Sequence, residues 1–248
     1  MTTITQDRWN AAQSAEAANW QDAASRSSRV LYELTEHSEV AKVLDTYLGG
    51  KEDLDGLEVG VGPLGTGFLA VHAAGYFGRI MGLEPLPILD VNLADKALQE
   101  YARAVRSRVE VVQAKGEAIP FGDETFHVTC CINVIDHAAH PDAILEEVRR
   151  VTKCGGIFVF GVNTLSFLGR IKWRVLRRMR PDKFLFVAHP HIYGWGQISR
   201  KLRRQSWTML WDNKPSLWQR MAGHGRMSFW ILEKRVSASH SPGDAGSA

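Results

Sequence analysis

Short apolar segments of strand length alternate with segments of helix length from residue 57 to residue 162. The runs VTCCINVI at 128–135 and GIFVFGV at 156–162 are almost continuously apolar, which is typical of strands in a sheet that is covered on both faces. Strands separated by helix-length crossovers run parallel, with right-handed connections. The pattern therefore predicts one α/β domain built on a doubly wound, mostly parallel sheet.

Further elements are predicted on both sides of this alternation. Residues 5–48 are predicted to be helical, because Trp9, Gln13, Glu16 and Trp20 recur at helical spacing and share one face. Strands are expected at 57–59, 79–84, 109–113, 126–132, 156–162, 207–211 and 226–233, and helices at 66–77, 93–105, 143–151 and 197–204. The domains expected are an N-terminal helical cap at 1–48, a main domain at 49–235 with an insertion at 163–205, and a disordered tail at 236–248.

The composition is that of a globular protein. The chain has 248 residues, of which 45% are hydrophobic, enough for one continuous core. No segment approaches the roughly 18 apolar residues of a membrane span, and no signal-peptide pattern is present, so we expect a cytoplasmic protein. The three cysteines cannot form an even set of disulfides and are expected to be reduced. The net charge of +3 does not favour a nucleic-acid partner, although basic residues gather between Arg170 and Arg204.

A glycine-rich turn follows the first strand of the alternation. Gly60, Gly62 and Gly65 precede the next helix, where glycine permits positive φ angles and lets a ligand approach the backbone. Glu84 ends the second strand, where a carboxylate can accept both hydroxyl protons of a ribose. These features fit SAM (S-adenosylmethionine) and NAD alike, and a tight turn without any ligand is a further interpretation.

Segments later in the chain separate these alternatives. The motifs are LEVGVGPLGTG at 57–67, GLEP at 82–85, AIPFGDETFH at 118–127, INVIDH at 132–137 and VTKCGG at 151–156. Together they resemble the motifs of class I SAM-dependent methyltransferases of the type 11 or UbiE-like group. The resemblance covers residues 57–162. It implies a Rossmann-like sheet of seven strands, mostly parallel with the last strand antiparallel, with N-terminal helices and a lid insertion after the fifth strand.

The resemblance also implies which residues hold the methyl donor. The glycines would approach its methionine and ribose parts, the first acidic residue would lie near its amino group, and the second would hold the ribose. The segment at 115–117 would flank the adenine, and the segment at 133–137 would face the acceptor. The residues expected at the donor are Glu58, Gly60, Gly62, Gly65, Glu84, Pro85, Lys115, Gly116, Glu117 and Asn133.

Two positions depart from the family pattern. Lys115 stands where an aspartate is usual, and lysine cannot accept a proton from the adenine amino group. Glu117 or a backbone carbonyl is the substitute that we expect. His127 stands where the family has the aspartate of a "Phe-Asp" pair, whose role is mostly structural.

Catalysis in this family needs alignment of donor and acceptor and, for a hydroxyl acceptor, a base. His137, after the fourth strand, is the first candidate, and His191, with His189, is the second. Hydrogen-bonding roles in the loops remain alternatives for all three histidines. No metal site is predicted, because Cys130 and Cys131 point to opposite faces of their strand and their thiols cannot converge.

The insertion contains a basic amphipathic segment at 168–180. Its apolar residues at helical spacing are Leu168, Ile171, Val175, Leu176 and Met179, and its basic residues are Arg170, Lys172, Arg174, Arg177 and Arg178. One interpretation is a lid helix with its apolar face on the core. The other is contact with an anionic acceptor or with the periphery of an anionic membrane.

The leading functional hypothesis is methyl transfer from SAM to a small-molecule or a glycan- or lipid-linked acceptor, more readily at oxygen than at nitrogen or carbon. A SAM-binding partner or regulatory protein without catalysis is an alternative, which Lys115 keeps open. A nucleic-acid-modifying methyltransferase is another, disfavoured by the lack of an Asn/Asp-Pro-Pro-Tyr motif and by the modest net charge. An NAD-dependent oxidoreductase comes last.

Overall fold

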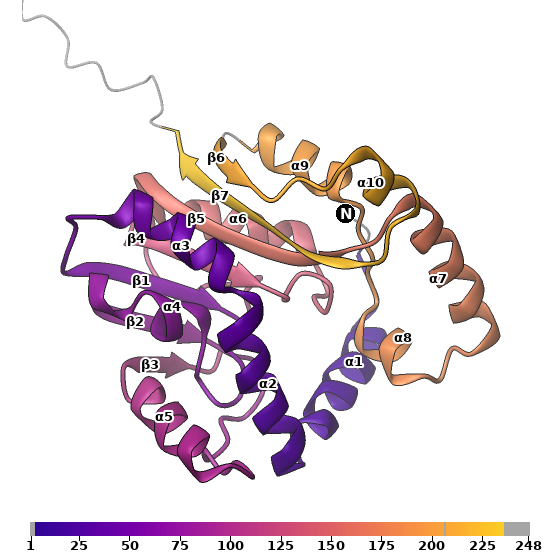
Figure 1. Ribbon diagram of the computed structural model, residues 1–248, viewed down its shortest axis with the longest axis horizontal. Coiled ribbons are helices and arrows are strands. Elements are labelled where there is room, and N and C mark those ends of the chain that lie inside the picture. Colours follow the sequence, from indigo (N-terminus) through magenta and orange to yellow (C-terminus); the bar gives the residue numbers. More distant parts are fainter. Residues whose placement is uncertain (1–2, 206, 236–248) are drawn as a thin grey trace, which may run out of the picture.

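A twisted sheet forms the centre of the molecule (Figure 1). The computed structural model describes residues 3–205 and 207–235, so the tail predicted at 236–248 lies outside the described residues. The strands are β1 (Leu54–Val59), β2 (Phe77–Leu83), β3 (Val109–Val112), β4 (Phe126–Ile132), β5 (Thr152–Thr164), β6 (Trp207–Asp212) and β7 (Arg226–Lys234). Their order in the sheet is β3-β2-β1-β4-β5-β7-β6. The first five strands pair in parallel, and β7 lies antiparallel between β5 and β6. The predicted fold class is confirmed.

The helices of the described residues are α1 (Gln6–Asn19), α2 (Ala23–Glu36), α3 (Ser38–Leu48), α4 (Phe68–His72), α5 (Lys96–Arg106), α6 (Pro141–Val151), α7 (Phe167–Met179), α8 (Phe184–Ala188), α9 (Trp195–Arg204) and α10 (Leu217–Ala222). The first three fall within the predicted helical cap. Over residues 3–205 and 207–235, none of the helices is both long enough and apolar enough to cross a membrane.

Two hydrophobic cores lie on opposite faces of the sheet. Cys130 belongs to the core that includes Leu44 of α3 and Phe68 of α4. Its neighbour Cys131 belongs to the core that includes Val148 of α6 and residues of α9. The two thiols therefore point to opposite faces, as the strand periodicity predicts.

The helix expected at 66–77 is shorter than predicted. Helix α4 ends at His72, because Ala73 leaves the helical conformation with φ −135°. A 3₁₀ turn, Ala74–Tyr76, follows and leads directly into β2. The end of the helix at His72 could not be predicted, because the mostly apolar sequence of this segment does not distinguish one long helix from a short helix and a turn.

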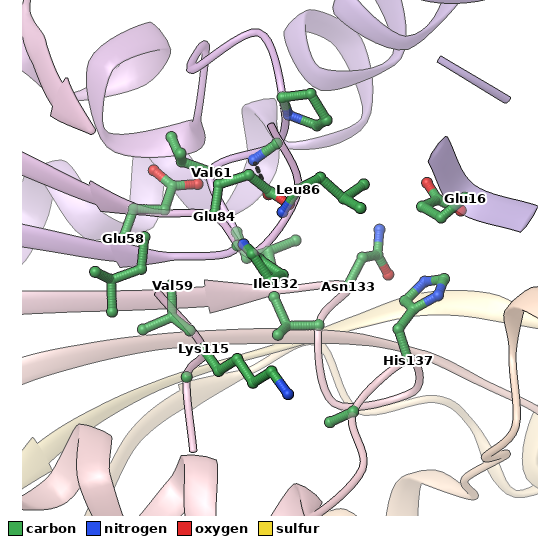
Figure 2. A pocket seen from close by; sticks show the side chains of 18 of the residues that line it. Glu16, Glu58, Val59, Val61, Glu84, Leu86, Lys115, Ile132, Asn133 and His137 are labelled. Carbon is green, nitrogen blue, oxygen red and sulfur yellow. Dashed lines mark hydrogen bonds between the residues drawn. The ribbon is translucent and has the colours of Figure 1, made fainter. Parts of the chain in front are cut away.

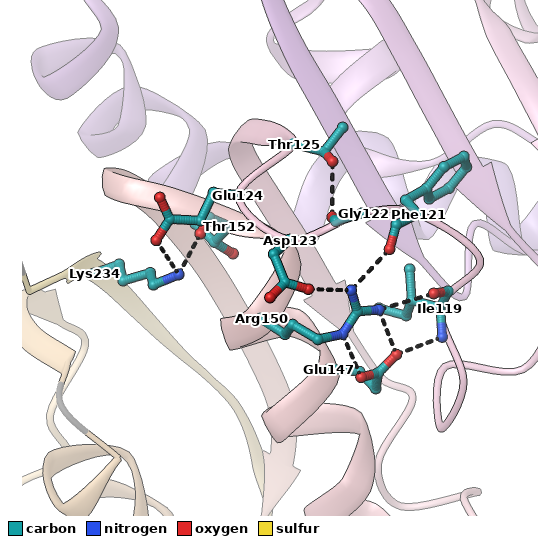
Figure 3. Close-up of polar contacts among 10 residues, drawn as sticks. All are labelled: Ile119, Phe121, Gly122, Asp123, Glu124, Thr125, Glu147, Arg150, Thr152 and Lys234. Atoms are coloured by element: carbon teal, nitrogen blue, oxygen red, sulfur yellow. Dashed lines mark hydrogen bonds and ion pairs between the residues drawn. The ribbon is translucent and has the colours of Figure 1, made fainter.

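Arg150 of α6 fastens the loop before β4 to the helix (Figure 3). Its guanidinium donates to Glu147 at 2.7 Å and to Asp123 at 2.8 Å. It also donates to the carbonyl oxygens of Phe121 and Ile119 at 2.8 and 3.0 Å. These bonds hold the IPFGDETF segment, whose chain continues into β4, so the motif has a structural role in the placement of that strand.

The apolar residues of α7 do not pack on the core, and the expectation of a core-facing apolar face is wrong. The residues that the pattern singled out are all exposed, by 39% to 70%: Leu168, Ile171, Val175, Leu176 and Met179. The buried side chain of the helix is Trp173, whose ring packs edge-on against Phe186 at 5.2 Å. The helix leans away from the sheet (Figure 1), so its outer apolar residues have no core to meet.

Helix α8 connects the insertion to the N-terminal cap. The guanidinium of Arg8 on α1 donates to the carbonyl oxygens of Phe186 and Val187 at 2.5 and 2.6 Å. Residues nearly 180 positions apart in the chain therefore meet at the edge of the site described next.

Candidate functional site

A pocket of about 180 Å³ opens at the carboxyl ends of β1, β2 and β4 (Figure 2). This edge of a parallel sheet is where α/β domains bind nucleotide-like ligands, because the strand order reverses there. Helices α1 and α2 supply one wall. The lining residues are Trp9, Gln13, Glu16, Trp20, Arg29, Tyr32, Glu33, His37, Glu58, Val59, Gly60, Val61, Gly62, Pro63, Phe68, Leu83, Glu84, Pro85, Leu86, Ala114, Lys115, Gly116, Glu117, Ile132, Asn133, Val134, His137, Ala138 and Ile144.

The glycine turn forms the floor of the pocket. Gly60 and Gly62 have φ angles of 75° and 79°, a conformation that side-chain-bearing residues rarely adopt. A Cβ atom on Gly60 would lie 2.3 Å from Cγ2 of Val134, whereas one on Gly62 would lie 3.7 Å from the ring of Trp20. The absence of a side chain at Gly62 therefore keeps open the space between the turn and α1.

Glu84 stands beside this turn at the end of β2 (Figure 2). One carboxylate oxygen accepts from the backbone N–H of Gly62 at 2.9 Å, and the other accepts from the N–H of Leu86 at 3.0 Å. The residue is buried, and burial raises the pKa of Glu84 to about 7 although these two hydrogen bonds lower it. Each oxygen keeps a further lone pair for a ligand hydroxyl.

Two more buried carboxylates face the same end of the pocket. Glu58 accepts from the N–H groups of Phe68 and Leu69 at 2.8 and 2.9 Å, and burial raises the pKa of Glu58 to about 7. Glu33 comes from α2, and its Oε2 is buried without a hydrogen-bond partner among the described residues. Burial and the nearby Glu58 raise the pKa of Glu33 to about 8. The pocket thus has three carboxyl groups whose ionised forms a bound cation would stabilise.

The segment expected at the adenine lies on the opposite side of the pocket. The ammonium group of Lys115 lies 3.8 Å from the centre of the Trp9 ring, in a cation–π contact with α1. Glu117 accepts from the backbone N–H groups of Ala139 and His140 at 3.1 and 3.2 Å. A Cβ atom on Gly116 would lie 2.7 Å from Val59, so close packing under the pocket requires glycine there.

His137 lies at the end of the pocket near Asn133 (Figure 2). Its Nδ1 is 2.8 Å from the carbonyl oxygen of Ala188, which can only accept, so Nδ1 carries the proton. Its Nε2 lies 3.7 Å from the buried carboxylate of Asp136. That carboxylate also accepts from Nδ1 of His189 at 2.9 Å.

Asp136, His137 and His189 form a compact group. Burial alone would raise the pKa of Asp136, but the two histidines lower it to about 2, so the carboxylate is ionised. The ligand atoms of the three residues lie within 4.8 Å of one another, so the group could also hold a metal ion. No local sequence pattern relates Asp136 to His189, because the two residues are 53 positions apart.

Gly65, His189 and His191, all predicted at the site, lie outside the pocket lining. Gly65 has a φ of 65°, and a Cβ atom there would meet the side chain of Arg106 at 2.5 Å, away from the pocket. His191 is buried, and its Nε2 hydrogen-bonds the carbonyl oxygen of Ala138 at 2.9 Å. The pocket lining contains the other residues predicted at the donor, and His137.

The N-terminal helices contribute pocket residues that no motif in the sequence predicted. Trp9, Gln13, Glu16 and Trp20 were predicted to share a helix face, and that face lines the pocket. Arg29, Tyr32, Glu33 and His37 from α2 and the residue after it line it too. The helical spacing of residues 29, 32, 33 and 37 was the available signal in the sequence.

The central part of the chain is similar to known sequences. Residues 57–160 match the family model described as a methyltransferase domain. An uncharacterized protein of Methanocaldococcus jannaschii is 31% identical over 118 residues, which are 47% of this chain and 48% of that protein. An uncharacterized methyltransferase of Mycobacterium leprae is 35% identical over 95 residues, which are 38% of this chain and 33% of that protein. The chain thus spans about half the length of the first of these relatives and a third of the second.

The fold also matches solved methyltransferase structures. Geranyl diphosphate C-methyltransferase from Streptomyces coelicolor, in complex with Mg²⁺, geranyl diphosphate and S-adenosyl-L-homocysteine (SAH), superposes with a TM-score of 0.60. The match covers 94% of this chain and 100% of that chain at 14% identity. At this identity the likeness shows the fold alone. The central part of the chain is thus similar to a methyltransferase domain, and the fold is that of solved methyltransferases.

Proposed function

We propose that this protein transfers the methyl group of SAM to an oxygen atom of a small-molecule or a glycan- or lipid-linked acceptor. The observation that carries the proposal is a single pocket in which the glycine turn, Glu84 and His137 meet. The relative from Streptomyces coelicolor, whose structure contains SAH, supports the choice of donor.

The charges of the pocket fit this donor. SAM supplies, when bound, an activated methyl group on a cationic sulfonium. Glu84 would accept the ribose hydroxyls with the lone pairs left after its bonds to Gly62 and Leu86. Glu33 has a buried oxygen without a partner among the described residues, and it would accept from the ammonium group of the methionine part. Glu58 would add negative charge nearby while it holds the start of α4.

His137 would accept the proton of an acceptor hydroxyl. Because its Nδ1 donates to Ala188, its Nε2 has the lone pair that a base requires. When Nε2 takes up a proton, the ionised Asp136 at 3.7 Å would stabilise the imidazolium cation. His189 would hold that carboxylate in position through its bond of 2.9 Å. His191 does not line the pocket, so as a base it would require a rearrangement of the insertion.

Calorimetric titration with SAH, SAM and NAD tests the donor. We expect SAH and SAM to bind and NAD not to bind. Transfer of a labelled methyl group from SAM to panels of hydroxyl, amine and carbon acceptors then tests the reaction. Binding of SAH without transfer to any panel would favour the alternative of a SAM-binding regulatory protein. Binding of NAD in place of SAH would refute the proposal.

His137→Gln tests the base. The glutamine amide cannot accept a proton from a hydroxyl, so we expect kcat to fall by about 100-fold to 10,000-fold, while SAH affinity stays within a few-fold of wild type. His140→Gln is a matched control, because His140 is exposed and lies outside the pocket lining. An unchanged kcat in His137→Gln would remove His137 as the base.

A further inference from the structure

A second cavity, of about 230 Å³, lies at the end of β5 and the start of β7. The first residues of α7, α9 and α10 surround it, and α7 contacts α10 (Figure 1). Its lining residues are Thr164, Leu165, Ser166, Phe167, Arg170, Gly194, Trp195, Gly196, Gln197, Arg200, Pro215, Leu217, Gln219, Arg220, Met221, His224 and Arg226. None of these residues lines the donor pocket.

The charge of this cavity is strongly one-sided. Arg170, Arg200, Arg220 and Arg226 line it, and no aspartate or glutamate is among the described residues that do so. Within residues 3–205 and 207–235, none of the four arginines forms an ion pair with a carboxylate. Four guanidinium groups without counter-charges repel one another, so an anion in the cavity would stabilise their arrangement.

Two hydrogen-bond donors of the cavity are buried without an acceptor among the described residues. Nε of Arg170 and Nε1 of Trp195 are both buried and have no hydrogen-bond partner among the described residues. The guanidinium of Arg220 lies over the Trp195 ring, 5.3 Å from its centre. A Cβ atom on Gly194 would meet the guanidinium carbon of Arg170 at 3.1 Å. These contacts bring Arg170 and Arg220 to the same place, the start of α9.

The backbone adds to the positive potential. Helices α7 and α9, of 13 and 10 residues, both begin at the cavity, with Ser166 and Gly194 at their N-caps. The N-terminus of a helix carries a partial positive charge and unpaired N–H groups, and both favour an anion. Side chains and backbone therefore favour the same kind of ligand.

The mouth of the cavity is apolar and exposed. Phe167, Leu217 and Met221 line it and are 48%, 73% and 49% exposed. Trp218, next to them on α10, is 74% exposed. Exposed apolar side chains around a cationic cavity fit a ligand with a charged head and an apolar chain.

We propose that this cavity binds the phosphate or diphosphate group of an amphiphilic molecule whose apolar chain lies along α7 and α10. Phosphate fits better than carboxylate, because four arginines exceed what the single charge of one carboxylate can neutralise. Binding here does not depend on the proposed methyl transfer.

The test measures binding of inorganic pyrophosphate and of decyl phosphate to the full chain by calorimetry. We expect both to bind wild type, decyl phosphate more tightly because of its chain. Arg170→Gln/Arg220→Gln should weaken both about tenfold or more, and the exposed single variant Arg220→Gln should weaken both to a smaller extent. Leu217→Ser should weaken only decyl phosphate. Arg103→Gln/Arg108→Gln, with two exposed arginines of the α5 region removed, is the matched control and should bind like wild type.

The outcomes separate this inference from the proposed function. SAH affinity should be unchanged in every one of these variants, which also shows that they are folded. If SAH fails to bind wild type while pyrophosphate binds, the proposed function fails and the phosphate site stands. The phosphate site would be overturned if neither pyrophosphate nor decyl phosphate bound at about 1 mM, the range of a weak site. An affinity loss in the Arg103→Gln/Arg108→Gln control equal to that in Arg170→Gln/Arg220→Gln would overturn it too. Vesicles with phosphatidic acid compared with soluble decyl phosphate then tell whether the source is a membrane lipid.

Discussion

Glu84→Gln is the substitution with the most informative expected effect, because both carboxylate oxygens already hold the backbone. Oε2 accepts from Gly62 and Oε1 from Leu86, at 2.9 and 3.0 Å. A glutamine has one oxygen, so its NH₂ group must face one of these N–H groups. One buried donor then loses its acceptor, which costs about 1 to 3 kcal/mol of stability.

The effect on donor binding should be larger. Two ribose hydroxyls would donate to the ionised carboxylate, and hydrogen bonds to a charged group contribute about 1.5 to 3 kcal/mol each. A neutral amide keeps part of this hydrogen-bond energy, so we expect Glu84→Gln to lose about 2 to 4 kcal/mol of binding free energy. The dissociation constant of SAH should accordingly rise about 30-fold to 1,000-fold. Calorimetry at pH 8.5 measures it, with Glu110→Gln, an exposed residue of β3, as the control.

The pH dependence provides an internal check. Because burial raises the pKa of Glu84 to about 7, the wild-type carboxyl is mostly ionised at pH 8.5 and mostly protonated at pH 6. Wild-type affinity for SAH should therefore fall as the pH falls through 7, and the difference between wild type and Glu84→Gln should shrink at pH 6. A difference below about threefold at pH 8.5, in a folded variant, would refute the role of Glu84.

Further expectations concern the turn, the buried charge and the loop. Gly62→Ala should weaken SAH binding, and its positive φ should lower the stability by about 1 to 2 kcal/mol. Gly60→Ala should lower the stability more, because its Cβ would lie 2.3 Å from Val134. Calorimetry measures the SAH affinity and thermal unfolding the stability, and equal stability of the two variants would contradict the prediction. The pKa of Glu33 is about 8 in the folded protein, above its unfolded value. The stability that protonated Glu33 contributes is therefore fully present below about pH 4.5 and is lost as the pH rises toward 8. Glu33→Gln should accordingly raise the melting temperature at pH 8 and not at pH 4.5; no change at pH 8 would argue against a buried carboxylate. Arg150→Gln should lower the free energy of unfolding in urea by about 1 to 3 kcal/mol, and a loss below about 0.5 kcal/mol would show that the five hydrogen bonds of Arg150 are dispensable.

The amino-acid sequence by itself determined the architecture and the residues around the glycine turn. Apolar runs such as 126–132 form strands wherever they lie in a covered sheet, so β4 has the predicted bounds. Glycines with positive φ and an acidic residue at the end of a strand are local features, since a few neighbouring residues decide the turn. Gly60, Gly62 and Glu84 were therefore predictable together, and the structure brings them into one pocket.

Only the tertiary structure decided what surrounds that pocket. The contact of His189 with Asp136 joins residues 53 positions apart, and Glu33 reaches the glycine turn only because α2 packs beside α4. The amphipathic pattern of α7 predicted a helix but not the face it buries, since Trp173 finds Phe186 while the expected apolar face stays exposed. Likewise the four arginines of the second cavity come from three helices and a strand, and no local pattern relates them. Such contacts depend on how preformed elements pack, and the free energy of that packing comes from residues distant in sequence rather than from local preference.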